Sequence, residues 1–409
     1  MPRYAVLGGH EHKAFCPMDN IFNLPPTCNP LSHAQSGSSS DMPAYDQSNH
    51  PHLILNAEVL SLTPTHITLN KSFPQHGEDF VSHEVKYDFL IYALGSKLPA
   101  PLDLWGTSPG GLTSSLGDSV ERVVYRGAKP EGIAWLRAHQ KLIEDAQSIL
   151  VVGGGALGIQ FATDIADIHP NKSVTLLHSR ERLLPKFDPD MHTEIHLALE
   201  SLGVKVILSE RLADRDALPK YNERGQRVVK TTKGREIVAD VVLMCTGQTP
   251  NTSILRTMDP STVNPDNGLA HVLTTMQLAP PPVSDVGASS EQEKRTPYPH
   301  MFAVGDAADA FGAIAAGHTA DFQAKVAANN ILILVRACET KGEEQHIDQE
   351  LEEYTPTEPG IKVSLGLTNY IYQINGEVGK HSDGAEDLNA AYLWKYWGAT
   401  VEREEDMYA

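Results

Sequence analysis

The segment Ile149–Gly158 constrains the fold of this chain more than any other part of its sequence. It reads Ile-Leu-Val-Val-Gly-Gly-Gly-Ala-Leu-Gly, so that an apolar run is followed directly by a GxGxxG pattern. The apolar run predicts a buried strand, and the residues that follow place apolar side chains at helical spacing. A GxGxxG pattern alone is weak evidence, but one between a strand and a helix is typical of a dinucleotide-binding βαβ unit.

Each glycine of this pattern has a separate physical task. We expect Gly153 to allow the tight turn from strand to helix, Gly155 to let the backbone approach a pyrophosphate, and Gly158 to let the helix pack closely on the strand. The pyrophosphate would lie at the N-terminus of the helix, where free N–H groups and the helix dipole favour an anion. The alternative is a glycine turn with a purely structural role.

The end of the second strand of such a unit reads the adenosine ribose. An acid there favours NAD, whereas an arginine accommodates the 2′-phosphate of NADP. The strand Ser173–Leu177 is followed by His178, Ser179 and Arg180, with Arg182 just beyond, and no acid stands at the reading position. This favours NADPH or tolerance of both nucleotides; the alternative is that the two arginines are simply solvated.

The surrounding sequence alternates between helical and strand patterns. This alternation predicts an α/β fold with a parallel sheet covered by helices. The expected elements are a helix over 131–147, strand Ser148–Val152, a helix to about residue 168, strand Ser173–Leu177, a helix near 190–202 and strand Val204–Leu208.

Charge and hydropathy exclude several kinds of partner. The chain has 52 acidic and 33 basic side chains, a formal net charge of −19, which disfavours nucleic acid and anionic lipid. No apolar run of about 18 residues is present, so we expect no membrane span, although peripheral contact is left open. The four cysteines form no CxxC or similar pair, which argues against a zinc or other metal site and a dithiol relay. They fit a reducing compartment, so we expect a cytoplasmic protein or, alternatively, a mitochondrial one.

Three further segments resemble a known family. Tyr87–Gly95 ends in Ala93-Leu94-Gly95, Ala239–Gly247 ends in Thr246-Gly247, and Met301–Asp309 contains Gly305-Asp306. Together with the glycine turn, and in this order, they resemble the pyridine nucleotide-disulfide oxidoreductase fold. The subgroup that the chain resembles is the apoptosis-inducing-factor-like proteins, which include ferroptosis suppressor protein.

The resemblance implies two Rossmann-like dinucleotide-binding domains and FAD and NAD(P)H as cofactors. The FAD domain would be discontinuous, and a small C-terminal segment would follow. The expected divisions are 1–125 for the first part of the FAD-binding domain, 126–250 for the NAD(P)H-binding domain, 251–335 for the second part of the FAD-binding domain, and 336–409 for the C-terminal segment.

The same resemblance assigns roles to individual residues. Ala93, Gly95, Gly305 and Asp306 would serve FAD, with the Asp306 carboxylate accepting hydrogen bonds from the ribityl hydroxyls; the alternative for Asp306 is a plain helix cap. Thr246 and Gly247 would belong to the NAD(P)H site. Lys13 would lie near the flavin ring, where a cation stabilises the reduced, anionic flavin, and it is the one weak catalytic candidate; the alternative is a solvated lysine.

The sequence departs from the family pattern in three places. Relatives begin with a strand–GxGxxG–helix unit that binds the FAD pyrophosphate, and nothing like it precedes Tyr4, so the FAD domain looks N-terminally truncated. Leu94 stands where the "ATG" pattern has Thr. Gln160 stands where relatives usually place a Glu near the nicotinamide, and a neutral amide keeps hydrogen bonding but loses the charge.

We therefore expect an FAD-dependent NAD(P)H oxidoreductase that passes electrons through flavin to a quinone-like or other small acceptor. The lack of a cysteine pair favours a small molecule over a disulfide as acceptor. The alternative is an NAD(P)H-binding sensor or interaction protein, or an inactive truncated flavoprotein.

Overall fold

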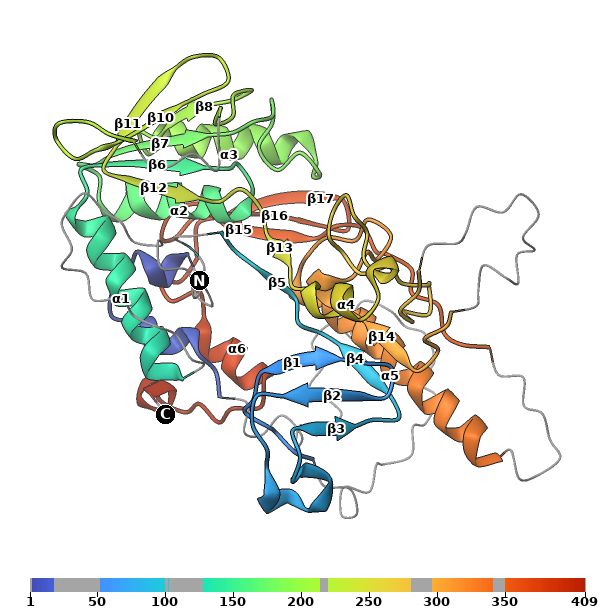
Figure 1. The fold of residues 1–409 in the computed structure, drawn as a ribbon. Coiled ribbons are helices and arrows are strands. Elements are labelled where there is room, and N and C mark those ends of the chain that lie inside the picture. Colours follow the sequence, from blue (N-terminus) through green and yellow to red (C-terminus); the bar gives the residue numbers. More distant parts are fainter. Residues whose placement is uncertain are drawn as a thin grey trace, which may run out of the picture. The chain divides into compact units, whose positions relative to one another are not determined.

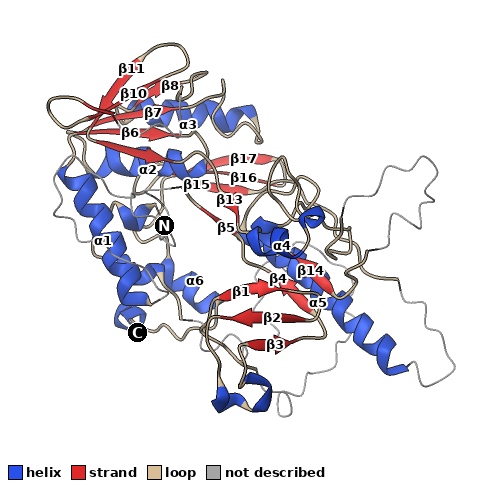
Figure 2. Cartoon of the chain, in the orientation of Figure 1, coloured by secondary structure: helices blue, strands red, loops and turns tan. Residues whose placement is uncertain are grey.

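The computed structural model describes residues 2–17, 52–99, 102, 128–213, 220–280, 296–340 and 350–408. The chain divides into two compact units, which are drawn in Figures 1 and 2. Unit 1 comprises Met1–Leu53, Leu98–Gly247 and Gly360–Ala409, and unit 2 comprises Ile54–Lys97 and Gln248–Pro359.

A four-stranded parallel sheet forms the centre of unit 1. Its strand order is β12-β6-β7-β8. The strands are β6 (Ser148–Val152), β7 (Ser173–Leu177), β8 (Lys205–Ile207) and β12 (Val241–Met244). The expected parallel sheet, and with it the α/β class, is confirmed.

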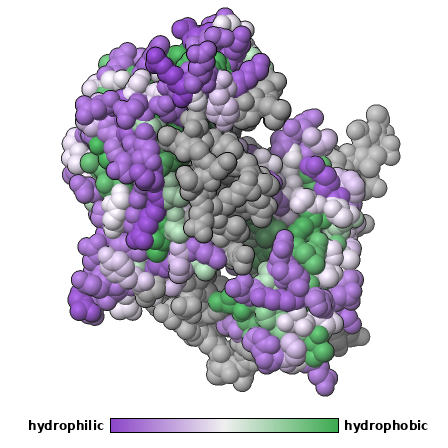
Figure 3. Space-filling view, turned by 60° about the vertical axis from the view of Figure 1, so that its left-hand side comes forward, coloured by the Kyte–Doolittle hydropathy of each residue, from purple (hydrophilic) through white to green (hydrophobic). Residues whose placement is uncertain are grey.

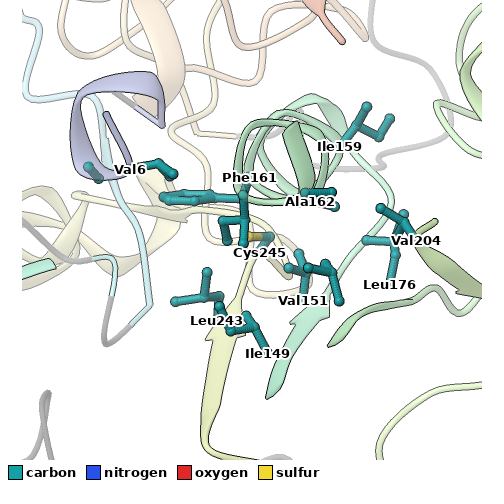
Figure 4. Packing of buried hydrophobic residues seen from close by; sticks show 14 of the residues in the cluster. Val6, Ile149, Val151, Ile159, Phe161, Ala162, Leu176, Val204, Leu243 and Cys245 are labelled. Atoms are coloured by element: carbon teal, nitrogen blue, oxygen red, sulfur yellow. The ribbon is translucent and has the colours of Figure 1, made fainter. Parts of the chain in front are cut away.

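Both faces of this sheet are covered, which explains why most residues of its strands are apolar. On one face, Ile149 and Val151 pack in the core with α2 (Ala156–Ile168); Figure 4 shows Phe161 of this helix against the sheet. On the other face, Leu150 and Val152 pack beneath an antiparallel sheet. That sheet consists of β9 (Lys220–Tyr221), β10 (Arg227–Lys230) and β11 (Glu236–Ala239).

Two more helices and both ends of the chain complete unit 1. The helices are α1 (Lys129–Asp145) and α3 (Pro189–Ser201), two residues and one residue earlier than expected. The N-terminal part contributes the 3₁₀ turns η1 (Arg3–Ala5) and η2 (Glu11–Ala14). The C-terminal part contributes the antiparallel sheet β15 (Ile361–Ser364), β16 (Tyr370–Ile374) and β17 (Glu377–His381), then α6 (Ala390–Tyr396) and the turn η9 (Glu404–Tyr408).

The division of the chain differs from the expected one at both ends. Residues 2–17 and 360–408 group with the glycine turn in unit 1, because β15 lies against α2, β16 lies against α3, and η1 lies against α1. The expected grouping placed 1–125 with the flavin half and set 336–409 apart. Which cofactor each part binds stays a prediction.

Unit 2 combines small sheets with two helices around its own core. The antiparallel sheet contains β1 (Val59–Leu62), β2 (His66–Leu69) and β3 (Glu84–Lys86). The connection between β2 and β3 contains the 3₁₀ turns η5 (Pro74–His76) and η6 (Glu78–Phe80). The strand pairs are β4 (Leu90–Tyr92) parallel to β14 (Met301–Ala303), and β5 (Ser96–Lys97) antiparallel to β13 (Thr249–Pro250). The remaining elements are α4 (Ser253–Met258), η7 (Pro260–Thr262), η8 (Gly305–Ala307) and α5 (Gly317–Thr340).

Hydrophilic residues, drawn in purple, predominate on the face shown in Figure 3, interrupted by separate hydrophobic patches. Within the described ranges, no helix has the length and apolar character that a membrane crossing requires. In the same ranges, no three His, Cys, Asp or Glu side chains gather as metal ligands would.

Candidate functional site

The turn between β6 and α2 depends on glycine at two positions. Gly153 has φ +124°, and a Cβ added there would lie 2.1 Å from the carbonyl oxygen of Cys245 on β12's extension. A Cβ on Gly158 would lie 1.9 Å from the carbonyl oxygen of Gly153. Both contacts are with backbone, which cannot move aside without opening the sheet or the helix, so Gly153 and Gly158 have the expected roles of turning the chain and packing the helix closely.

Gly155 differs from its neighbours because nothing surrounds its Cβ position. No atom lies within 4 Å of an added Cβ, and its φ of −82° and ψ of 177° are open to any residue. Gly155 is the N-cap of α2 and has no side-chain cap, so no side chain covers the first N–H groups of this 13-residue helix at that position. An open helix N-terminus at a glycine turn fits an anionic pyrophosphate.

The middle glycine ties the turn to the next strand. Gly154 N donates to Nδ1 of His178 (3.0 Å), and Leu184 N donates to the Gly154 carbonyl (3.0 Å). A Cβ on Gly154 would lie 2.5 Å from Cδ2 of Leu183 and 2.7 Å from Cγ of His178. The turn is therefore packed directly against the residues that follow β7.

The residues expected to read the ribose lie at the carboxyl edge of the same sheet. Ser179, Arg180 and Arg182 follow β7 and are exposed. Thr246 and Gly247 follow β12, which pairs with β6, so they lie next to the glycine turn. The structure thus brings together all the residues predicted for the nucleotide site that come from the ends of β6, β7 and β12.

Gln160 lies one turn into α2 and contacts the C-terminal sheet. Its Nε2 donates to Oγ of Ser364 on β15 (3.1 Å), and the Thr163 hydroxyl lies 3.5 Å from the Ser364 carbonyl oxygen. Ser364 is buried and holds the Gln160 side chain. Sequence reasoning missed Ser364, because nothing in the local pattern of residues 360–364 signals a contact with α2.

A second group of predicted residues lies at the carboxyl ends of β4 and β14 in unit 2. These strands are parallel, and Val304 N donates to the Tyr92 carbonyl (3.0 Å), so the segments that follow them meet. Ser96 Oγ lies 3.0 Å from Oδ2 of Asp306, and 2.8 Å from Oε1 of Gln248. Gly95 and Gly305 have φ values of +59° and +72° and turn the chain on either side of this contact.

The position of Asp306 excludes the alternative of a cap for α5. Asp306 is half-buried and lies in η8, whereas α5 begins eleven residues later at Gly317. Gly305 N donates to Oε1 of the buried Gln323 on α5 (2.7 Å), which holds the turn that carries Asp306. Ala93 is exposed beside this edge. Ser96 and Gln323 were not predicted; Ser96 could have been found from its position directly after Gly95.

Lys13 belongs to an ion cluster of unit 1 in which its own side chain is buried and that of Glu404 is exposed. Its Nζ lies 2.9 Å from Oδ2 of Asp387 and 2.9 Å from Oε1 of Glu404, and its side chain is buried. Although burial opposes it, the hydrogen bonds that the Lys13 ammonium donates to the carboxylates of Glu404 and Asp387 raise the pKa of Lys13, so the ammonium form is retained. Lys13 is therefore not a solvated lysine, and its role beside flavin stays a prediction.

The α/β fold and the glycine turn between β6 and α2 define a dinucleotide-binding protein. The family model described as "Pyridine nucleotide-disulphide oxidoreductase" matches residues 30–327. The chain belongs to this family, and the match confirms the expectation of an oxidoreductase that uses a pyridine nucleotide and a flavin.

Curated relatives agree with this placement. The chain is 40% identical over 404 residues to Fe-regulated protein 8 of Mycosarcoma maydis, covering 98% of this chain and 85% of that protein. It is 30% identical over 237 residues to ferroptosis suppressor protein 1 of Mus musculus, covering 58% of this chain and 56% of that protein. It is 30% identical over 250 residues to FAD-dependent oxidoreductase FVFD30 of Flammulina velutipes, covering 61% of this chain and 68% of that protein. The expected resemblance to ferroptosis suppressor protein is confirmed.

Proposed function

We propose that this chain is an FAD-dependent NAD(P)H oxidoreductase that passes electrons through the flavin to a quinone-like or other small acceptor. The observation that supports it most is the glycine turn, where Gly153 and Gly158 are required by backbone contacts while Gly155 leaves the N-terminus of α2 open. An open, rigid turn of this kind is the expected cradle for the pyrophosphate of a dinucleotide.

The residues around the turn would orient the nucleotide. The N–H groups at the start of α2 bind the pyrophosphate, and the exposed Arg180 and Arg182 bind a 2′-phosphate, which favours NADPH over NADH. Gln160, held by Ser364, offers its amide oxygen to a bound ligand without adding a charge.

In unit 2, Asp306 and Ser96 would hold the ribityl chain of FAD. The carboxylate is an acceptor for ribityl hydroxyls, and the neighbouring hydroxyl can donate or accept. Bound FAD supplies hydride acceptance from the nicotinamide and onward transfer of electrons to the acceptor. The protein groups named here bind and orient; none is needed as a nucleophile.

The cysteines favour a small-molecule acceptor over a disulfide relay. The sequence has no closely spaced cysteine pair, and burial raises the pKa of the Cys245 thiol far above its usual range, so this thiol is unreactive. Electrons would therefore leave to a diffusible compound, of which a quinone is the class that we propose.

Flavin content tests the proposal directly. We expect the purified full chain to absorb at about 450 nm after reconstitution with FAD, close to one FAD per chain. Asp306→Ala should lower the bound fraction at least about fivefold, because a hydrogen bond to a charged group is lost. Asp309→Ala is the matched control, since the Asp309 carboxylate is already bound by Asn264 and Asn267 and should leave flavin content unchanged.

A chain that binds NADPH but no flavin would contradict the oxidoreductase proposal and would support the sensor alternative. Equal flavin loss in the Asp306→Ala and Asp309→Ala variants would show that neither carboxylate binds the ribityl chain specifically. A flavin-loaded chain that oxidises NADPH with a quinone would support the acceptor class, and oxidation only with a disulfide substrate would contradict it.

The arginines after β7 give a second expectation. Arg180→Ala should weaken NADPH binding about 10- to 100-fold and leave NADH within about twofold, because only NADPH carries the 2′-phosphate that pairs with the guanidinium. Titration calorimetry with both nucleotides measures this. Arg224→Ala removes the same charge from the exposed β9–β10 turn and should change neither affinity. Equal losses for the two nucleotides would show that Arg180 does not read the phosphate.

A further inference from the structure

The imidazole of His178 is held at both ring nitrogens. Its Nδ1 accepts from Gly154 N (3.0 Å), and its Nε2 donates to the Arg182 carbonyl (3.1 Å), an arrangement that requires the neutral ring with the proton on Nε2. The backbone is fixed as well, because His178 N donates to the Ile207 carbonyl and the His178 carbonyl accepts from Glu210 N. The ring is buried, at 9% exposure, and cannot reorient without moving these partners.

This ring joins the glycine turn to the segment that carries the arginines. Both backbone groups of Gly154 are used, the N–H by His178 and the carbonyl by Leu184 N. The opposite side of the ring is bound to the Arg182 carbonyl. The turn that would bind the pyrophosphate and the segment that would bind the 2′-phosphate are thus connected through one imidazole.

The groups around His178 disfavour a charged ring. Burial lowers the pKa of His178 most, Arg180 and His192 on α3 lower it further, and the Arg182 carbonyl opposes them. Glu210 lies beside the His178 backbone, but its carboxylate is bound by Thr231 and Arg235. The charges that neighbour the ring therefore disfavour an imidazolium at this position.

We propose that His178 is a positioning residue for the dinucleotide: its unprotonated Nδ1 holds Gly154, and through it the glycine turn, in the conformation that binds the pyrophosphate. The inference rests on the proposed nucleotide site. When Nδ1 takes up a proton, its N–H faces the N–H of Gly154, two donors oppose each other, and the turn must shift. Nucleotide affinity should then be full above pH 6.5, the ordinary pKa of histidine, and fall as the pH drops below it.

Binding of NAD⁺ to the full chain, measured by calorimetry from pH 8 to pH 5.5, tests this proposal. NAD⁺ is the suitable probe, because the 2′-phosphate of NADP⁺ itself titrates near pH 6, as phosphate monoesters do at about that value. We expect the affinity of the native chain to fall over the acid part of this range, by at most roughly five- to tenfold, because burial lowers the pKa of His178 below its ordinary value.

Two asparagine variants separate His178 from its neighbour. In His178→Asn the amide oxygen takes the place of Nδ1 and does not titrate, so binding should stay within about threefold of native at pH 8 and become independent of pH. His192→Asn is the matched control: the native Nδ1 accepts from Leu183 N on the same segment, and an amide can do so too. This variant should keep the acid loss.

Each outcome decides a different point. A native affinity that does not change with pH would overturn the role of His178, as would an acid loss that disappears in His192→Asn instead. No NAD⁺ binding at pH 8 would contradict the nucleotide site itself, and with it the proposed function. Nitrogen-15 spectra of the native chain provide an independent check that needs no variant: a neutral ring with the proton on Nδ1 would also overturn the proposal, and a proton on Nε2 would support it.

Discussion

Gly155→Asp should abolish dinucleotide binding while leaving the protein folded. The site around Gly155 is open, and its backbone conformation suits any residue, so the new side chain has room. An aspartate at the N-cap is favoured, because its carboxylate accepts hydrogen bonds from the first N–H groups of the helix. These are the groups that would bind the pyrophosphate, and the added charge repels it. We expect the NADPH affinity to fall about 100-fold or more, or about 3 kcal/mol.

A graded series distinguishes volume, hydrogen bonding and charge at this position. Gly155→Ala adds volume alone, Gly155→Asn adds a neutral cap, and Gly155→Asp adds a charged cap, so the affinity should fall in that order. The thermal midpoint should rise slightly or stay constant along the same series. A Gly155→Asp chain that still binds NADPH with native affinity would remove the nucleotide from this turn, and a chain that unfolds would show that the open space around Gly155 is needed by the fold.

The glycine turn is the part of the molecule that the sequence predicts well. The strand expected over Ser148–Val152 has these bounds in the structure, and the helix after it ends at Ile168 as expected. The reason is that the constraints are local. Gly153 must adopt φ +124° and the helix must approach its own strand closely at Gly158, and both requirements are visible as glycines within ten residues of sequence.

The parts that the sequence did not predict depend on contacts between distant segments. Ser364 lies 204 residues from Gln160, and no period or spacing links them. The resemblance predicts a place for Lys13 beside the flavin but not its partners Asp387 and Glu404, which come from the other end of the chain. The contact between Ser96 and Asp306 could be predicted in part. The sequence indicates both strands that precede these residues, but it does not show that the two strands lie side by side.

Arg3→Met should lower the free energy of unfolding by about 3–5 kcal/mol, the usual cost of breaking a buried ion pair from one side. Arg3 Nη2 lies 3.0 Å from Oδ1 of Asp164 on α2, and both side chains are 1% exposed. The same guanidinium donates to the carbonyls of Gly366, Leu367 and Glu386, so the substitution leaves these C-terminal groups without their donor as well. Chemical denaturation of the native chain and of the variant measures this effect. Arg137→Met is the control: it removes an exposed guanidinium 3.8 Å from Glu11 and should lower the free energy of unfolding by less than about 1 kcal/mol.

The cost of Arg3→Met should depend on pH in a defined direction. Burial raises the pKa of Asp164 from 3.8 to about 6, and Arg3 opposes this rise. The folded chain therefore binds more protons than the unfolded chain between these two values, so the contribution of Asp164 to stability falls as the pH rises through this window and is level above it. Without Arg3 the pKa of Asp164 rises further. In acid the Asp164 carboxylate is then protonated, which removes the cost of a buried charge without a partner. Arg3→Met should consequently be less destabilising at pH 5 than at pH 8, and Asp164→Asn added to it should remove the difference. An equal cost at both pH values would mean that Arg3 stabilises unit 1 through its three carbonyl contacts and not through the charge of Asp164.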